Sequence, residues 1–202
     1  KVVAFSTGNV YGLTSVDGGG SRETDVLTPV GEYAMSCLGR ERIFEYFSRK
    51  LDIPMAIIRL NYACEMRYGV LVDIAKRVWA ADPVDLGMGY LNTIWQGDAN
   101  AMTLRAFDHL ATPPWVVNMS GPERLLIRDL GEQFGRILGK PVRFTGSESA
   151  TAFLTNAKPG LETLGPLRIA APQLIEWIAD WVARGGKSLG KPTHFESRDG
   201  RY

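Results

Sequence analysis

The sequence has almost no excess of charge of either sign. Its 23 lysines and arginines against 22 aspartates and glutamates leave a formal net charge of +1 over 202 residues. This balance lacks the basic excess that is typical of proteins that bind nucleic acid or anionic lipid. Long apolar runs are also missing, because the run from 53 to 60 contains Pro54 and Arg59 and is far shorter than the roughly 20 residues that cross a bilayer. We therefore expect neither nucleic acid nor a membrane as a partner.

Cysteine and histidine are scarce. The only examples are Cys37, Cys64, His109 and His194, and no Cys-x-x-Cys motif occurs. This count excludes a disulfide framework and gives no metal-ligand spacing, so we expect no metal and a cytoplasmic location. Hydrophobic residues make up 45% of the chain, which is enough for one substantial core of the ordinary globular kind.

The sequence does not begin with methionine, and residues 1–6 already have the apolar character of a buried strand. We interpret the chain as the interior of a larger gene product, although a trimmed protein would look the same. Residues 12–29 then form a loop rich in Gly, Ser, Thr and Asp, which we expect to be a flexible surface segment.

An amphipathic helix over 31–50 and a continuous apolar strand over 55–60 follow, so the first 60 residues predict a βαβ unit. Alternating elements continue to the end of the chain, which makes the class α/β. They are helices over 69–80, 98–110, 127–138 and from Pro172 to Gly185, strands near 84–86, 93–96, 115–119 and 141–144, and a polar tail over 187–202.

Small polar residues stand where the first strand ends. The segment reads Phe5-Ser6-Thr7-Gly8-Asn9-Val10-Tyr11-Gly12. Open α/β sheets bind ligands at the carboxyl ends of their strands, and Tyr33, near the start of the long helix, can face the same edge. By themselves, Ser6 and Thr7 could equally be turn-capping hydroxyls, and Asp98 and Asn100 are more simply helix caps than ligand contacts.

Several segments together resemble the extended short-chain dehydrogenase/reductases, the NAD-dependent epimerases and dehydratases of sugar nucleotides. Residues 6–12 resemble the family's Ser-Ser/Thr-x-x-Val-Tyr-Gly, and Tyr33 resembles the Tyr of Tyr-x-x-x-Lys. Arg59-Leu60-Asn61 is similar to a strand end of the family. Further similar segments are Trp95-Gln96-Gly97-Asp98-Ala99-Asn100-Ala101 and Val116-Val117-Asn118-Met119-Ser120-Gly121. Each motif is weak alone, and their order over about 2–138 makes the match specific.

The resemblance implies a partial Rossmann-like parallel sheet that lacks the first βαβ units, with a smaller mixed α/β substrate-binding lobe. Residues 1–62 would belong to the Rossmann-like domain, and 63–202 would form the lobe and tail, with about 93–120 packing back on the first part. The resemblance also implies a homodimer that pairs through the helix over 31–50. The substrate would be a sugar or sugar nucleotide, and the cofactor NAD or NADP.

The resemblance also implies roles for single residues. Tyr33 would exchange the proton of a substrate hydroxyl while nicotinamide takes hydride from the same carbon, and Thr7 would hydrogen-bond the substrate oxygen. General-base assistance of this kind is worth roughly 10²- to 10⁴-fold. The implied cofactor contacts are Ser6, Cys37, Asn61 and Tyr62, and the implied substrate contacts are Asn9, Arg59, Asn61 and Arg67.

The chain departs from the family in three places. Cys37 replaces the lysine that lowers the tyrosine pKa, and Arg40, one turn further, is a possible substitute with different geometry. Leu91-Asn92 stands where the family places a diphosphate-binding arginine, for which Arg67 or Arg124 could serve. No Gly-x-x-Gly-x-x-Gly turn follows a first strand, so we expect this chain alone to bind NAD poorly or not at all.

Two alternatives stay open at this point. A catalytically silent family member could use the same cavity for ligand binding or sensing, which the Cys37 replacement would suit. A structural subunit completed by a second chain would supply the early strands from elsewhere.

Overall fold

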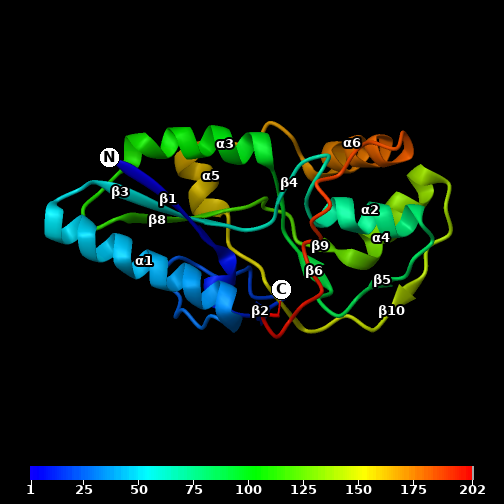
Figure 1. Cartoon of the computed structure of the whole chain (residues 1–202), viewed down its shortest axis with the longest axis horizontal. Coiled ribbons are helices and arrows are strands. Elements are labelled where there is room, and N and C mark those ends of the chain that lie inside the picture. Colours follow the sequence, from blue (N-terminus) through cyan, green and yellow to red (C-terminus); the bar gives the residue numbers. More distant parts are fainter. Residues whose placement is uncertain (202) are drawn as a thin grey trace.

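A parallel three-stranded sheet forms the core of one half of the molecule in the computed structural model, which describes residues 1–201 (Figure 1). The strands are β1 (Val2–Thr7), β3 (Met55–Leu60) and β8 (Trp115–Met119), in the order β1-β3-β8. The register pairs Thr7 with Leu60 and Leu60 with Met119. The carboxyl ends of all three strands therefore lie at one edge of the sheet.

Helices cover both faces of this sheet (Figure 1). Helix α1 (Gly31–Leu51) connects β1 to the parallel strand β3, which confirms the predicted βαβ unit. Helices α3 (Gln96–Arg105) and α5 (Lys158–Leu164) lie on the opposite face from α1. The core on the α3 and α5 side is apolar and includes Ala56, Ile58, Met102, Val117 and Leu164.

The local sequence explains why these elements begin and end where they do. The first five residues of β3 are buried, as expected for an apolar strand with helices on both faces. Helix α1 ends at Asp52, which adopts the left-handed conformation with φ 49°, and Pro54 follows two residues later. Helix α4 (Ile127–Leu138) ends at Gly139 in the same conformation, as its sequence predicted.

The other half is built on three helices and several short strand pairs. Helices α2 (Val70–Trp79), α4 and α6 (Ala171–Ala183) pack around the largest apolar cluster, which contains Leu71, Ile74, Phe134 and Ile178. The remaining pairs are β2 (Thr14–Ser15) with β11 (Thr151–Ala152), β4 (Ala63–Cys64) with β7 (Ile94–Trp95), β5 (Val84–Asp85) with β10 (Phe144–Thr145), and β6 (Tyr90–Leu91) with β9 (Leu125–Leu126). Short 3₁₀ helices occupy Gly8–Tyr11 (η1) and Ala106–His109 (η2).

The structure confirms the α/β class and corrects two local predictions. The segment 12–29 is not simply a flexible surface loop, because β2 pairs with β11 and Ser21 is buried. Asp98 does not cap α3. Its carboxylate instead accepts hydrogen bonds from the backbone N–H groups of Arg168 and Ile169, at 2.9 and 3.0 Å. Both differences arise from partners more than 65 residues away in the sequence, which local patterns do not reveal.

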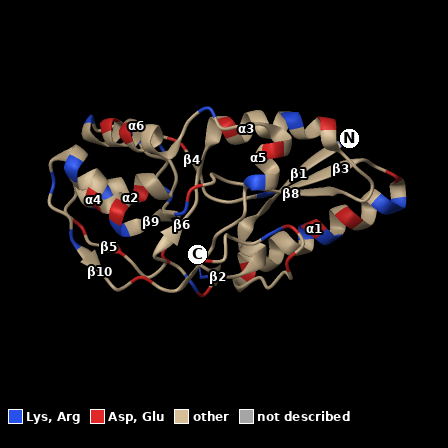
Figure 2. Cartoon of the chain, turned by 180° about the vertical axis from the view of Figure 1, so that it is seen from behind, with Lys and Arg blue, Asp and Glu red and all other residues tan. Residues whose placement is uncertain are grey.

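Residues of both charge signs are interspersed along the ribbon (Figure 2). On α1, for example, Glu45 pairs with Arg42 and Arg49, both at 3.2 Å. None of the helices in residues 1–201 combines the length and apolar character needed to cross a membrane. In the same residues, no three His, Cys, Asp or Glu side chains come together to hold a metal ion.

Candidate functional site

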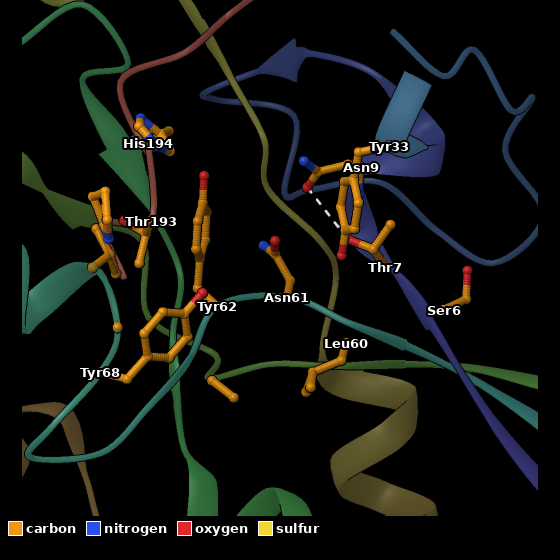
Figure 3. Close-up of a pocket in the computed structure, with 14 residues that line it drawn as sticks. Ser6, Thr7, Asn9, Tyr33, Leu60, Asn61, Tyr62, Tyr68, Thr193 and His194 are labelled. Atoms are coloured by element: carbon orange, nitrogen blue, oxygen red, sulfur yellow. Dashed lines mark hydrogen bonds between the residues drawn. The ribbon is translucent and has the colours of Figure 1, made fainter. Parts of the chain in front are cut away.

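A cavity of about 380 Å³ opens beside the carboxyl ends of β1 and β3 (Figure 3). The chain brings together segments that are far apart in the sequence to line it. They are Ser6, Thr7, Asn9, Tyr33, Leu60, Asn61, Tyr62, Ala63, Tyr68, Gly69, Val70, Pro192, Thr193 and His194. Six of the predicted site residues are in this set: Ser6, Thr7, Asn9, Tyr33, Asn61 and Tyr62.

Thr7 and Tyr33 meet at one end of the cavity (Figure 3). The Thr7 hydroxyl lies within hydrogen-bonding reach of the Tyr33 phenol. It also accepts a hydrogen bond from the Asn9 backbone N–H at 3.3 Å and donates to Asn9 Oδ1 at 3.5 Å. Thr7 can occupy this position because Gly8 follows it, and a Cβ on Gly8 would lie 2.9 Å from Thr155 Cγ2. The turn after β1 therefore packs closely against its neighbours. Ser6 and Thr7, the two hydroxyl residues at the end of β1, line the cavity.

The phenol of Tyr33 has a pKa above its ordinary value of 10. Desolvation by burial is the largest cause, and Cys37, one helical turn further along α1, adds to the increase. The Thr7 hydrogen bond and the Arg40 charge act in the opposite direction without overcoming burial. Tyr33 is therefore protonated near neutral pH.

Cys37 interacts with the Tyr33 side chain but does not line the cavity. Its side chain is buried with Val10 and Tyr11, and its Sγ accepts a hydrogen bond from Arg40 Nη2 at 3.4 Å. The predicted contact of Cys37 with a cofactor stays a prediction. Arg40 contacts the thiol and lies near enough to lower the pKa of Tyr33. The exposed Arg40 therefore supplies the positive charge of α1 near the Tyr33 phenol.

Ser6 presents a hydroxyl without a partner. Among the described residues, Ser6 Oγ is buried and makes no hydrogen bond, although the side chain lines the cavity. A buried hydroxyl without a hydrogen bond costs free energy in the folded state. This atom is therefore suited to a polar group of a bound molecule.

Asn61 and Asn92 join the end of β3 to the other half of the molecule. Asn61 Nδ2 donates to Asn92 Oδ1 at 2.9 Å, and Asn92 Nδ2 donates to the carbonyls of Gly121 and Thr155 at 3.0 and 2.8 Å. Both asparagines are almost fully buried. The position where the resemblance placed an arginine thus holds a buried amide, Asn92, which connects three segments of the fold.

Arg59 lies outside the cavity lining, within the sheet and α1. Its guanidinium donates to both carboxylate oxygens of Glu41, at 3.0 and 2.8 Å, and to Tyr11 Oη at 2.7 Å. Tyr11 Oη donates in turn to Asn118 Oδ1 at 2.8 Å. Burial raises the pKa of Tyr11 to about 12. Because its donors are directed at these partners, Arg59 holds the sheet to α1, and its predicted contact with substrate stays a prediction.

The two other arginines considered for a diphosphate are also engaged outside the cavity lining. Arg67 pairs with Glu65 at 3.0 Å, and Arg124 pairs with Asp17 at 2.6 Å and lies over the ring of Tyr90. The predicted contact of Arg67 with substrate stays a prediction.

The far end of the cavity was not predicted. Tyr68, Gly69 and Val70 line it at the start of α2, and Thr193 and His194 line it from the C-terminal segment (Figure 3). Gly69 has φ 128°, and a Cβ there would lie 2.5 Å from Cys64 Sγ. Tyr62 stands between the two ends (Figure 3) and has a left-handed φ of 45°, which is uncommon for a non-glycine residue and is a signal associated with functional sites.

Comparison with known proteins identifies the fold. No protein-family model and no curated protein sequence matches the chain. Among solved structures, a UDP-glucuronic acid 4-epimerase from Bacillus cereus in complex with UDP-glucuronic acid and NAD superposes with a TM-score of 0.75 at 19% identity, over 90% of this chain and 61% of the other. The chain has the fold of the extended short-chain dehydrogenase/reductases. This confirms the predicted partial Rossmann-like fold.

Two further solved structures of this fold are similar. A UDP-glucose 4-epimerase with UDP-glucose from Thermotoga maritima has a TM-score of 0.76 at 16% identity, over 91% of this chain and 63% of the other. A dTDP-glucose 4,6-dehydratase from Bacillus anthracis in complex with NAD has a TM-score of 0.76 at 17% identity, and the match covers 91% of this chain and 62% of the other. The chain thus spans about three-fifths of the length of these extended short-chain dehydrogenase/reductases.

Proposed function

We propose that the protein containing this chain is an NAD(P)-dependent epimerase- or dehydratase-like oxidoreductase that acts on a hydroxyl of a sugar, which can be nucleotide-linked. The observation that carries the proposal is the meeting of the Thr7 and Tyr33 hydroxyls at the carboxyl edge of the sheet, inside a cavity. The similar solved structures support it, since their descriptions name sugar-nucleotide epimerases and a dehydratase with NAD or sugar nucleotides.

The geometry supports proton transfer at the phenol oxygen of Tyr33. Oxidation of a sugar hydroxyl releases a proton from oxygen and a hydride from carbon. Tyr33 would accept and return the proton of the substrate hydroxyl. Thr7, whose hydroxyl reaches the same phenol, would hold the substrate oxygen next to Tyr33 by a hydrogen bond. A cavity of about 380 Å³ lies within the size range of small-molecule sites.

The residues on the cavity wall fit part of a nicotinamide cofactor. The unpartnered Ser6 hydroxyl is the observation that favours a polar ligand group there, and Asn61 and Tyr62 line the same region. When bound, NAD or NADP supplies the hydride acceptor. The sequence offers no glycine-rich turn after a strand for the pyrophosphate, so we expect the isolated chain to hold this cofactor weakly.

The raised pKa of Tyr33 favours a second candidate function. A protonated phenol that lacks a neighbouring lysine is a good hydrogen-bond donor and a poor base. A protein of this fold could therefore bind a sugar ligand without converting it.

Substitution of Tyr33 or Thr7 tests the first function. In the NAD-binding protein that contains this chain, Tyr33→Phe is expected to lower turnover of UDP-glucose or UDP-glucuronic acid by about 10²- to 10⁴-fold, because the proton acceptor is lost. Thr7→Val is expected to lower it less, with product formation followed by chromatography of the nucleotide sugars. Tyr46→Phe removes an exposed phenol from the same helix and serves as the control. Turnover of Tyr33→Phe equal to that of the Tyr46→Phe control would refute the catalytic role.

We also propose a homodimer that pairs through α1, as the resemblance implies. The helix exposes Ile43, Phe47 and Leu51, of which Ile43 is 60% exposed. Burial of such side chains contributes about 25 cal/mol per Å² of apolar surface. The double variant Ile43→Glu with Phe47→Glu is expected to shift the chain to monomer in sedimentation-velocity runs. Lys50→Glu on the same helix is the control, and a sedimentation coefficient that the double variant leaves unchanged would contradict pairing through α1.

A further inference from the structure

The chain after α6 returns across the molecule and forms part of the cavity wall. In Figure 1 this segment, in red, runs from α6 to the centre of the fold, where it ends beside β2. Its residues Pro192, Thr193 and His194 line the cavity. Composition predicted only a polar tail for this segment. In the structure the segment has a defined position against three other elements. We call residues 191–200 the C-terminal strap.

Several independent contacts hold the strap in place. Asp73 on α2 accepts hydrogen bonds from both the backbone N–H and the hydroxyl of Thr193, each at 2.7 Å. Phe195 is 1% exposed and belongs to the largest apolar cluster. Arg198 donates to the carbonyl of Thr151 at 2.7 Å and to its hydroxyl at 2.6 Å. The strap is therefore anchored on both sides of His194 and is part of the fold.

The strap also reaches the start of the helix that carries Tyr33. A Cβ on Gly31 would lie 2.3 Å from the Gly200 carbonyl oxygen, and a Cβ on Gly200 would lie 2.3 Å from the Val30 carbonyl oxygen. Both glycines have positive φ, 82° and 74°. The two backbones approach so closely that neither position has room for a side chain, and the strap therefore packs against the start of α1 as well as lining the far end of the cavity.

His194 is the residue that the strap presents at the far end of the cavity (Figure 3). Its backbone is left-handed, with φ 50°, a conformation that costs free energy for any residue with a Cβ. The anchors at Thr193 and Phe195 on either side maintain this conformation. Residues held in such conformations concentrate at ligand sites, and here His194 lines the cavity at the end opposite Thr7 and Tyr33 (Figure 3).

The surroundings of His194 favour an oxygen-rich, anionic ligand group. The strap residue Pro192 is shared with a smaller neighbouring cavity whose walls include Arg67, Lys76 and Lys191, with Asp73 as the acidic member. Lys76 Nζ donates to Ser188 Oγ at 3.2 Å. Lys76 and Lys191 thus place positive charge beside the strap, which favours phosphoryl or carboxylate oxygens.

We propose that the C-terminal strap determines ligand specificity, with His194 donating a hydrogen bond to a phosphoryl or carboxylate oxygen of the ligand whose sugar hydroxyl lies at Thr7 and Tyr33. This inference rests on the proposed function and assigns a specificity-determining residue to it. Thr193 and Asp73 are positioning residues, because they hold the strap and act through His194.

Calorimetric titration of the NAD-binding protein that contains this chain with UDP-glucose, UDP-glucuronic acid and UDP tests the inference. His194→Ala is expected to weaken binding by about tenfold, the size of one hydrogen bond to a charged group. An equal loss for all three probes identifies a phosphoryl oxygen as the contact. A loss confined to UDP-glucuronic acid identifies its carboxylate. His109→Ala removes the other histidine, which does not line the cavity, and is expected to bind all three probes as the unaltered protein does.

A second variant separates contact from folding. His194→Gly relieves the left-handed conformation, so it is expected to melt at the same temperature or higher while binding as weakly as His194→Ala. Unchanged binding of every probe by both His194 variants would overturn the inference and leave the proposed function standing. If the NAD-binding protein with the unaltered sequence binds none of the three probes at millimolar concentration, the proposed function is overturned, and the inference with it.

Discussion

Replacing Cys37 by lysine is expected to lower the pKa of Tyr33 and to raise turnover at neutral pH by at least about tenfold, within the range that general-base assistance provides. The side chain at 37 lies one turn after Tyr33 on α1 and contacts its phenol. A cation at that distance favours the phenolate, whereas burial and the thiol now favour the neutral phenol. The pH at which the rate is half-maximal is therefore expected to move downward.

The measurement needs a signal from Tyr33 itself. Tyrosines labelled with ¹³C at Cζ report phenol ionisation, and Tyr33→Phe assigns the resonance. Cys37→Ser is the neutral control and is expected to leave the pKa of Tyr33 above 10. Arg40→Gln is expected to raise this pKa further, because the Arg40 charge now lowers it. A pKa that Cys37→Lys leaves unchanged would show that α1 cannot activate the phenol, which favours the binding function over the catalytic one.

The residues of the near end of the cavity were predictable from the sequence. Ser6 and Thr7 end an apolar strand and Asn9 follows it, and Asn61 and Tyr62 follow the next parallel strand. Parallel strands end at the same edge, so strand ends identify neighbours in space. The βαβ unit itself followed from the apolar pattern of residues 1–60.

The remaining features depend on contacts that no local pattern contains. Arg59 lies near a strand end like the cavity residues, but its guanidinium donates a hydrogen bond to Glu41, 18 residues earlier in the sequence. His194 is one of ten residues in a polar segment, and only the burial of Phe195 and the Asp73 contact, 120 residues apart from Thr193, bring it to the cavity. Side-chain direction and long-range anchoring therefore account for what the sequence alone did not reveal.

The buried pair of Arg59 and Glu41 is expected to be the most sensitive position of the fold. Both side chains are 5% exposed and lie 2.8 Å apart. Glu41→Gln leaves the guanidinium buried without a compensating charge, and removal of one partner from such a pair costs about 3–5 kcal/mol of the free energy of unfolding. Urea denaturation followed by tryptophan fluorescence measures the loss. Glu45→Gln breaks the exposed pairs on the same helix and is expected to cost less than about 1 kcal/mol.

The double variant Arg59→Met with Glu41→Leu decides whether the pair itself stabilises the fold. It removes both charges and fills the space with apolar side chains, so it is expected to recover most of the stability that Glu41→Gln loses. Tyr11 keeps its hydrogen bond to Asn118 at 2.8 Å in this variant, so its phenol is not left without a partner. A double variant as unstable as Glu41→Gln would contradict this account, because the cost would then come from the loss of the Arg59 contacts with Tyr11 and the Glu23 carbonyl rather than from an uncompensated charge.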